Sequence, residues 1–234
     1  MPAVHHLFVA AALLVAAQPA ARFNLDTPRT VVRVGDPAIA PDGRTAVIVV
    51  SRTNMAENRS DAELVLVEIA TKTQRVLSSR RGVTMPIWSP DGSALAFLAS
   101  VEGRAQVFVL PMSGGEARQV TFSPTGVQTY SWRPDGRGFA YAALDEPAKK
   151  EGEDRFNRAF EIQHNSFLQL EAPVPSHLWV VPLDTGTARR VTSGSWSLPI
   201  TYAPGAPPPP PSWSPDGRTI AIERRPNAYS GDFD

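Results

Sequence analysis

The side chains best suited to nucleophilic chemistry are scarce in this sequence. It contains no cysteine, which excludes disulfides, thiolate metal sites and a cysteine nucleophile. A serine nucleophile on a strand-to-helix elbow lies in the pentapeptide Gly-x-Ser-x-Gly, which does not occur in the sequence. Ser195 follows a glycine, but its surroundings are more simply those of a loop residue after a strand. We therefore expect no catalytic residue in this chain.

The histidines do not indicate a metal site either. His5 and His6 lie near the N-terminus, and His164 and His177 do not stand in a spacing such as His-Glu-x-x-His. We expect structural or solvated roles for His164 and His177. The sequence thus predicts neither a bound metal nor a cofactor.

Charged residues gather in one segment of the chain. Residues 145–155 contain five carboxylates and three basic side chains. A carboxylate that is partly shielded from water can hold a cation through charge-assisted hydrogen bonds. The plainer alternative is a solvated loop whose charges maintain solubility. Over the whole chain 23 basic residues balance 23 acidic ones, so the strong positive field needed for binding nucleic acid is absent.

The N-terminus has the pattern of a targeting segment. Residues 7–17 form an uninterrupted apolar run, which is shorter than the roughly 20 residues that a membrane-spanning helix needs. Small residues follow it as far as Ala21, as at a signal-peptidase site. We therefore predict a secretory signal at 1–21, a periplasmic or secreted protein, and no membrane span once the signal is removed. An uncleaved anchor and a misassigned start are the alternatives.

A repeated turn organises the rest of the chain. It reads Ile-Ala-Pro-Asp-Gly at 39–43 and Trp-x-Pro-Asp-Gly at 88–92, 132–136 and 213–217. Proline sets the first corner of such a turn, aspartate can bond its own backbone, and glycine tolerates positive φ. An apolar stretch of strand length follows each turn, at 45–50, 94–99, 138–143 and 219–223.

A second apolar strand repeats downstream of the turn. It occupies 64–69, 107–112 and 178–183, and a short turn and a return strand follow it each time. One unit of about 45 residues has the size and content of a four-stranded propeller blade. We predict an all-β protein, a partial β-propeller of four-stranded antiparallel blades with about three and a half blades present. The predicted units are about 30–84, 85–128, 129–197 and 210–234.

Two irregular segments interrupt the repeat. One is an insertion at 144–175, and the other, at 195–211, ends in five consecutive prolines that favour polyproline II. We place both on the propeller rim. Closed propellers use 4–8 blades to hide their sheet edges, so we expect 22–234 to be a fragment cut within its propeller. A short natural protein completed by a partner is the alternative.

The sequence of the repeat resembles that of a known family. Trp-Ser-Pro-Asp-Gly, together with Leu-Trp-Val-Val-Pro-Leu at 178–183 and Gly-Gly-Glu-Ala-Arg-Gln-Val-Thr at 114–121, resembles the TolB-type propeller repeat. Such repeats form TolB itself and the N-terminal propeller of prolyl oligopeptidase family serine peptidases. The opening at 32–52, the stretch at 155–161 and the two irregular segments are more similar to the dipeptidyl and acylaminoacyl peptidases of that family.

The resemblance carries functional implications. It implies a Ser-Asp-His triad on a C-terminal α/β-hydrolase domain outside this chain, with the propeller gating access for short peptide substrates. It also makes Glu151, Glu153 and Glu161 candidates for binding the free amine of a substrate. The alternative is a TolB-like periplasmic module that binds proteins and has no enzymatic activity.

The repeated residues themselves have a structural interpretation. Trp88, Trp132 and Trp213 could be taken for a sugar-stacking set, but their identical places in the repeat favour packing between blades. We assign structural roles also to the turn residues Asp91, Gly92, Asp135, Gly136, Asp216 and Gly217.

Overall fold

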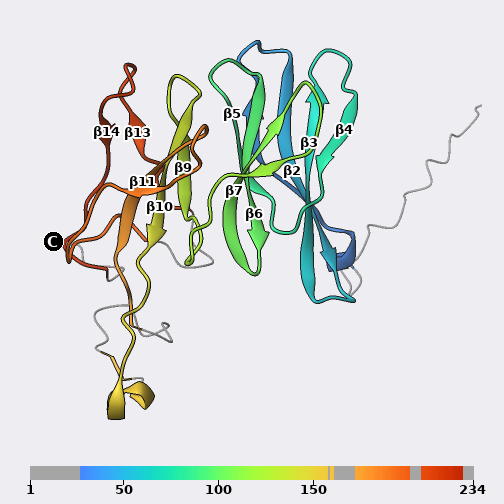
Figure 1. Cartoon of the computed structure of the whole chain (residues 1–234). Helices are drawn as coiled ribbons and strands as arrows, with labels where there is room; N and C mark the ends of the chain where they lie inside the picture. Colours follow the sequence, from blue (N-terminus) through green and yellow to red (C-terminus); the bar gives the residue numbers. More distant parts are fainter. Residues whose placement is uncertain (1–26, 158, 161–171, 201–206, 229–234) are drawn as a thin grey trace, which may run out of the picture.

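The protein is a row of antiparallel β-sheets stacked face to face (Figure 1). The computed structural model describes residues 27–157, 159–160, 172–200 and 207–228. The predicted signal at 1–21 lies outside this part. Within it, no helix is long and apolar enough to cross a membrane.

Four sheets follow one another along the chain, preceded by the 3-10 helix η1 (Thr27–Thr30). The first consists of β1 (Val32–Ile39), β2 (Thr45–Asn54), β3 (Arg59–Glu68) and β4 (Gln74–Ser78). The second consists of β5 (Thr84–Trp88), β6 (Ala94–Val101), β7 (Arg104–Pro111) and β8 (Arg118–Gln119). The third consists of β9 (Thr129–Trp132), β10 (Gly138–Leu144), β11 (Ser176–Pro182) and β12 (Arg189–Arg190). The fourth pairs β13 (Ser212–Trp213) with β14 (Ile220–Ala221).

Each four-stranded sheet is a simple meander, so its connections alternate between two faces of the protein. The links between first and second strands and between third and fourth strands share one face, which we name the turn face. The links between second and third strands lie on the opposite, hairpin face, where the long β10–β11 connection extends away from the sheets (Figure 1). The chain also begins its first strands, and ends its fourth strands, at the hairpin face.

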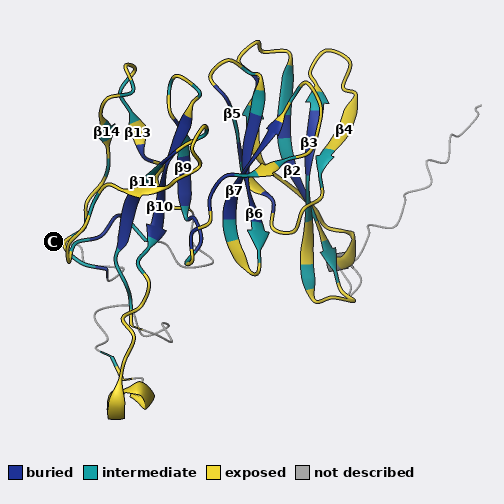
Figure 2. Cartoon of the chain, viewed as in Figure 1, coloured by how far each residue is buried: buried dark blue, intermediate teal, exposed yellow. Residues whose placement is uncertain are grey.

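The hydrophobic core lies between the sheets rather than inside any one of them (Figure 2). Between the first and second sheets, Val47 and Leu64 pack with Leu95 and Phe97, all of them buried. A smaller cluster joins the third sheet to the fourth. Each blade therefore depends on its neighbour for burial, as propeller blades do.

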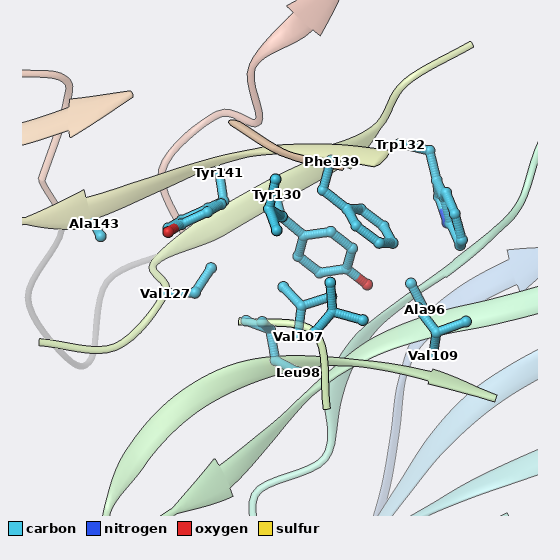
Figure 3. Close-up of a cluster of buried hydrophobic side chains, with 12 residues drawn as sticks. Ala96, Leu98, Val107, Val109, Val127, Tyr130, Trp132, Phe139, Tyr141 and Ala143 are labelled. Carbon is cyan, nitrogen blue, oxygen red and sulfur yellow. The ribbon is translucent and has the colours of Figure 1, made fainter. Parts of the chain in front are cut away.

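The interface between the second and third sheets is the most aromatic (Figure 3). Tyr130, Phe139 and Trp132 of the third sheet pack on Val107 and Leu98 of the second. The Tyr130 hydroxyl donates to the carbonyl of Met85 at 2.6 Å, so this buried polar group has a partner across the interface. Burial raises the pKa of Tyr130 well above its ordinary value, which keeps the phenol neutral.

The Pro-Asp-Gly turns are built alike in all four sheets. In each turn the glycine N–H donates at 2.9 Å to the carbonyl three residues earlier, that of Ala40, Ser89, Arg133 or Ser214. The glycines adopt φ between 67° and 72°, where a side chain would be strained. A Cβ on Gly92 would also lie 3.4 Å from Cδ of Pro41 in the preceding turn. The turns of neighbouring blades are thus in contact.

The repeated tryptophans connect successive blades. The indole N–H of Trp88 donates to the carbonyl of Ala38 in β1 at 2.9 Å, and that of Trp132 donates to Ile87 in β5 at 3.0 Å. Ile39 occupies the same repeat position in the first sheet and is 66% exposed, because no described sheet precedes it. At two of the three tryptophan positions, Trp88 and Trp132, the indole therefore links adjacent blades through a hydrogen bond.

The fold predicted from the repeat is confirmed: the protein is all-β, with four-stranded antiparallel sheets in an unclosed, propeller-like row. The sequence patterns missed the first strand of every sheet as an element of its own. These strands, β1, β5, β9 and β13, lie before the turn, and each ends at or just before the turn motif. They are short or interrupted by bulges, as in β1 and β5, so their side chains lack a clear alternation.

We predict that Trp132→Phe lowers the free energy of unfolding by about 1–3 kcal/mol, because it leaves the half-buried carbonyl of Ile87 without its donor. Trp213→Phe is the matched control, because the indole nitrogen of Trp213 has no hydrogen-bond partner. Urea unfolding of both variants measures the difference. Equal losses would contradict the role assigned to this hydrogen bond.

The Pro-Asp-Gly turn at 88–92 is expected to make the stability of the protein depend on pH. The Asp91 carboxyl accepts hydrogen bonds from the hydroxyl of Ser89 and from the N–H and hydroxyl of Ser93. These bonds, with that of Ser89 contributing most, lower its pKa to about 2. The pKa of this carboxyl is about 3.8 in the unfolded chain, so its stabilising effect is present above about pH 4 and is lost as the pH falls toward 2.

Ser89→Ala removes the largest cause of this shift. We expect the stability difference between wild type and Ser89→Ala, measured by urea unfolding from pH 7 to pH 2, to shrink as the pH falls. A difference that stays constant over this range would show that Asp91 is not stabilised as a carboxylate by Ser89.

Candidate functional site on the hairpin face

The hairpin face carries the charged segment that the sequence singled out. Its described part contains the 3-10 helix η2 (Gly152–Phe156), which lies well away from the sheets (Figure 1). Glu151 and Glu153 are both exposed there, Glu151 at the N-cap position and Glu153 in the first turn. Neither carboxylate forms an ion pair with another described residue. The third candidate, Glu161, lies outside the described residues.

The neighbours of these carboxylates give the segment a mixed surface. The Lys150 ammonium donates to the carbonyl of Asn157 at 2.5 Å, and the guanidinium of Arg155 lies 4.5 Å from the ring centroid of Phe156. Phe156 itself is 77% exposed. An exposed aromatic ring beside free carboxylates can contact an amphipathic ligand, and nothing in this arrangement resembles an acid–base pair.

A polar clamp fixes the base of the insertion to the third sheet. The Asp145 N–H donates to the carbonyl of Pro175 at 2.8 Å, which closes the insertion like the end of a hairpin. The Asp145 carboxylate accepts a hydrogen bond from Arg190 at 2.9 Å and lies 3.6 Å from Nε2 of His177. The insertion therefore leaves the sheet from a fixed point.

His177 is the buried member of this clamp, with a side chain that is fully shielded from solvent. Its Nδ1 lies 3.1 Å from the Thr192 hydroxyl and its Nε2 lies 3.2 Å from the carbonyl of Gly194. A neutral imidazole that carries its proton on Nε2 satisfies both contacts. Burial lowers the pKa of His177 and so favours this neutral form, although the charge of Asp145 acts in the opposite direction. The ring therefore has a structural role.

The second blade contains the same device with a different residue. Gln106 stands one residue before Val107, as His177 stands before Leu178, and it bonds the hydroxyl of Thr121 as His177 bonds that of Thr192. In both blades the threonine hydroxyl also accepts from the strand, from Val107 N or Leu178 N. Aligning the repeats by these threonines would have revealed this role for His177.

A broad, open cleft lies beside the β2–β3 hairpin of the first blade and has a volume of about 1030 Å³. Arg29, Arg52, Arg59 and Arg81 line it together with Asp61 and Glu63. Arg52 pairs with Glu63 at 3.1 Å and Arg59 pairs with Asp61 at 2.6 Å, so much of the charge is balanced within the cleft. No sequence pattern indicated this cleft, because its residues come from η1, the hairpin and the link between two blades.

The described residues offer binding surfaces rather than reaction chemistry. They contain no group of three or more His, Asp or Glu side chains placed to hold a metal ion. Ser195 is exposed, in the loop that follows β12, and makes none of the side-chain hydrogen bonds found among the described residues. The site is therefore a face with an acidic projection, an arginine-lined cleft and no assembled catalytic group in the part that the structure describes.

Comparison with known proteins agrees with this picture. A family model described as the TolB β-propeller domain matches residues 29–170. The chain is 39% identical over 106 residues to a Bacillus subtilis protein named uncharacterized peptidase YuxL, and 29% identical over 142 residues to dipeptidyl-peptidase 5 of Porphyromonas endodontalis. These matches cover 44% and 59% of this chain, but the chain spans only 16% and 20% of the two relatives.

A solved structure supports the fold alone. Acylaminoacyl peptidase from Pyrococcus horikoshii superimposes with a TM-score of 0.58 at 17% identity, over 75% of this chain and 27% of that one. The resemblance inferred from the repeat is therefore confirmed at the level of the family and of the propeller fold.

The equivalence of His177 and Gln106 yields a prediction. His177→Gln keeps a polar group opposite Thr192, so we expect the free energy of unfolding to change by less than about 1 kcal/mol. His177→Ala leaves a cavity and an unpaired hydroxyl, and is expected to cost about 2–4 kcal/mol. Thermal unfolding compares the two, and equal losses would contradict the equivalence.

Proposed function

Because the chain belongs to the TolB β-propeller family, we propose that it is the propeller of an exported serine peptidase of the prolyl oligopeptidase family. The observation that carries this proposal is the similarity to two proteins named as peptidases, each several times longer than the stretch that matches. Their additional length leaves room for an α/β-hydrolase domain bearing the triad.

The topology supports a particular arrangement of such a domain. First strands begin and fourth strands end at the hairpin face, so a domain joined to either end of the blades would approach from that face. The β10–β11 insertion and the arginine-lined cleft stand on the same face. In this proposal the propeller covers the active site, admits short peptides and excludes folded proteins, and so contributes substrate selection and water exclusion.

The insertion is the proposed contact with substrate. Glu151 and Glu153 project from a segment that is fixed at its base by Asp145 and Arg190, and Glu161 follows in the same insertion. Carboxylates held over an active site can bind the protonated α-amine of a peptide. This role deepens the proposal and is separate from the structural role of His177.

A second candidate function follows from the description of the family model, which names TolB. In that case the chain is part of a periplasmic module that binds proteins through the rim of its propeller and catalyses no reaction. The two functions differ in what the gene encodes beyond the matched region, and in whether the protein hydrolyses peptides.

Export is part of both proposals. Residues 7–17 are apolar and too short to span a membrane, and small residues come directly after them, as in a secretory signal. N-terminal sequencing of the mature protein tests this, with cleavage near Ala21 expected and an intact Met1 contradicting it.

The peptidase proposal makes a prediction about the gene beyond codon 234. We expect further Pro-Asp-Gly blades, then Gly-x-Ser-x-Gly within an alternating strand–helix pattern, then the Asp and His of a triad. The product of that longer gene should hydrolyse chromogenic dipeptide substrates, whereas residues 1–234 alone should not. A stop codon after one or two more blades, or hydrolysis by residues 1–234 alone, would contradict the proposal.

The acidic candidates predict a change in KM. In the longer protein, Glu151→Gln and Glu153→Gln are each expected to raise KM about 5- to 50-fold for peptides with a free α-amine, because each variant removes a charge-assisted hydrogen bond. Peptides with an acetylated amine are the control and should be unaffected. Equal effects on both substrates would show that the carboxylates do not recognise the amine.

A further inference from the structure

The arginine-lined cleft occurs in the first blade, where the β2–β3 hairpin is longer than its counterpart in the second blade. β2 and β3 remain paired as far as Asn54 and Arg59, whereas pairing of β6 with β7 ends at Val101 and Arg104. A connection of four residues closes the longer hairpin, and a connection of two residues closes the shorter one. The extended end of the hairpin forms one wall of the cleft.

The link between the first and second blades forms another wall. The carbonyl of Arg81 accepts a hydrogen bond from the N–H of Ser100 in β6 at 2.7 Å, which attaches the link to the second blade. Gly82 has a φ of 68°, and a Cβ there would lie 3.2 Å from Cβ of Ser100, so glycine permits this close approach. The backbone of Arg81 is therefore fixed beside the cleft, while the residue remains exposed.

Glu63, another lining residue, differs in its role from the equivalent residues of the other blades. It stands one residue before Leu64, at the position that Gln106 and His177 occupy in the second and third blades. Gln106 and His177 are buried, and each bonds a threonine that follows the fourth strand. Glu63 instead pairs with Arg52 at 3.1 Å, with 34% of its side chain exposed. A position that fastens a strand in two blades thus contributes a charge to the cleft in the first.

The ion pairs of the cleft leave one arginine available. Arg52 is paired with Glu63, and Arg59 is paired with two carboxylates of its own hairpin, at 2.6 and 2.9 Å. The Arg81 guanidinium makes no hydrogen bond or ion pair with any residue that the structure describes. Its five N–H donors are therefore free to bind a ligand.

The nearest acidic group does not neutralise Arg81. Hydrogen bonds from Asn54 and then Arg59 lower the pKa of Asp61, and the charge of Arg81 adds to this effect from the link. The two oxygens of the Asp61 carboxylate already accept from Asn54 at 2.7 Å and from Arg59 at 2.6 Å. Arg81 therefore adds an unpaired positive charge to the lining of the cleft.

These features suit a ligand with a single carboxylate. A guanidinium binds a carboxylate through two parallel N–H···O bonds, and the exposed hydroxyls of Ser60 and Ser79 in the lining can donate to the same group. A dianion such as phosphate would bring a second negative charge toward Asp61 and Glu63. The exposed side chain of Met55 offers apolar surface beside the polar groups, as an amino-acid residue requires.

We propose that the arginine-lined cleft binds a carboxylate of a peptide, either the C-terminal group or an acidic side chain, on the guanidinium of Arg81. The choice of a peptide rests on the proposed function, whereas the choice of a carboxylate rests on the charges of the cleft. The hairpin face then carries two sites of opposite preference. The insertion of the third blade holds an amine, and the cleft of the first blade holds a carboxylate.

Ligand-observed fluorine NMR with the full product of the gene tests the proposal. N-trifluoroacetyl-alanine carries an α-carboxylate, N-trifluoroacetyl-aspartic acid α-amide carries a side-chain carboxylate, and N-trifluoroacetyl-alanine amide carries neither. We expect saturable line broadening with a Kd on the order of 1 mM for a carboxylate probe, and none for the neutral amide. The carboxylate that binds more tightly identifies the source of the group. No probe contains a peptide bond between two residues, so binding is measured whether or not the protein is a peptidase.

Four variants assign the binding to the cleft. Arg81→Gln should weaken binding at least about tenfold, and Arg81→Lys, which keeps the charge without the planar fork, about threefold. Glu63→Gln releases Arg52 and should tighten binding about 2- to 5-fold, a gain that misfolding cannot produce. Arg137→Gln is the matched control, because it removes the same charge from an exposed arginine on the turn face and should leave the Kd unchanged.

Three results would overturn the proposal. They are the absence of saturable broadening with both carboxylates, equal binding of the neutral amide, and an affinity in Arg81→Gln no lower than that in Arg137→Gln. Hydrolysis of peptides by the longer protein is measured separately, so a failure of this site is distinguishable from a failure of the peptidase proposal.

Discussion

The packing of one sheet against the next is the interaction on which the rest of this structure depends. A four-stranded antiparallel sheet has two faces, and in this protein both faces of the second and third sheets are apolar. No sheet can bury such faces by itself, so stability comes from the row of sheets. Where the row ends, the first sheet leaves Val34, Ile39 and Val76 at least half exposed. This is the surface that a further blade would cover in a closed propeller.

The Pro-Asp-Gly turn links local conformation to this packing. Positive φ at its glycine closes the turn, and the absence of a side chain there lets the proline of the preceding turn approach. The tryptophan before the turn then crosses to the neighbouring blade, as Trp88 does to Ala38. The same few residues therefore fix the end of one strand and the distance between two sheets, which explains why they recur together in the sequence.

The two faces of the row serve different purposes. The turn face consists of short, similar connections that repeat from blade to blade, and its residues are occupied in holding the blades together. The hairpin face has connections of different lengths, and it carries the acidic insertion, the arginine-lined cleft and a small cavity lined in part by Pro208–Pro211. Variation in these loops leaves the cores unchanged because the strands that bear them are already fixed by the sheets on either side.

The sequence alone determined the strands that follow each turn, the blade as the repeating unit and the family, because turn chemistry and apolar runs are local properties of the chain. It also located the acidic insertion, although not the clamp of Asp145, Arg190 and His177 that fixes its base. Only the tertiary structure showed that Thr129 lacks a partner while Thr121 has two, and that Trp213 does not reach a carbonyl as Trp88 and Trp132 do. The threonine contacts depend on how strands pair within a blade, and the tryptophan contacts depend on the distance between neighbouring blades. Neither can be obtained from residue types alone.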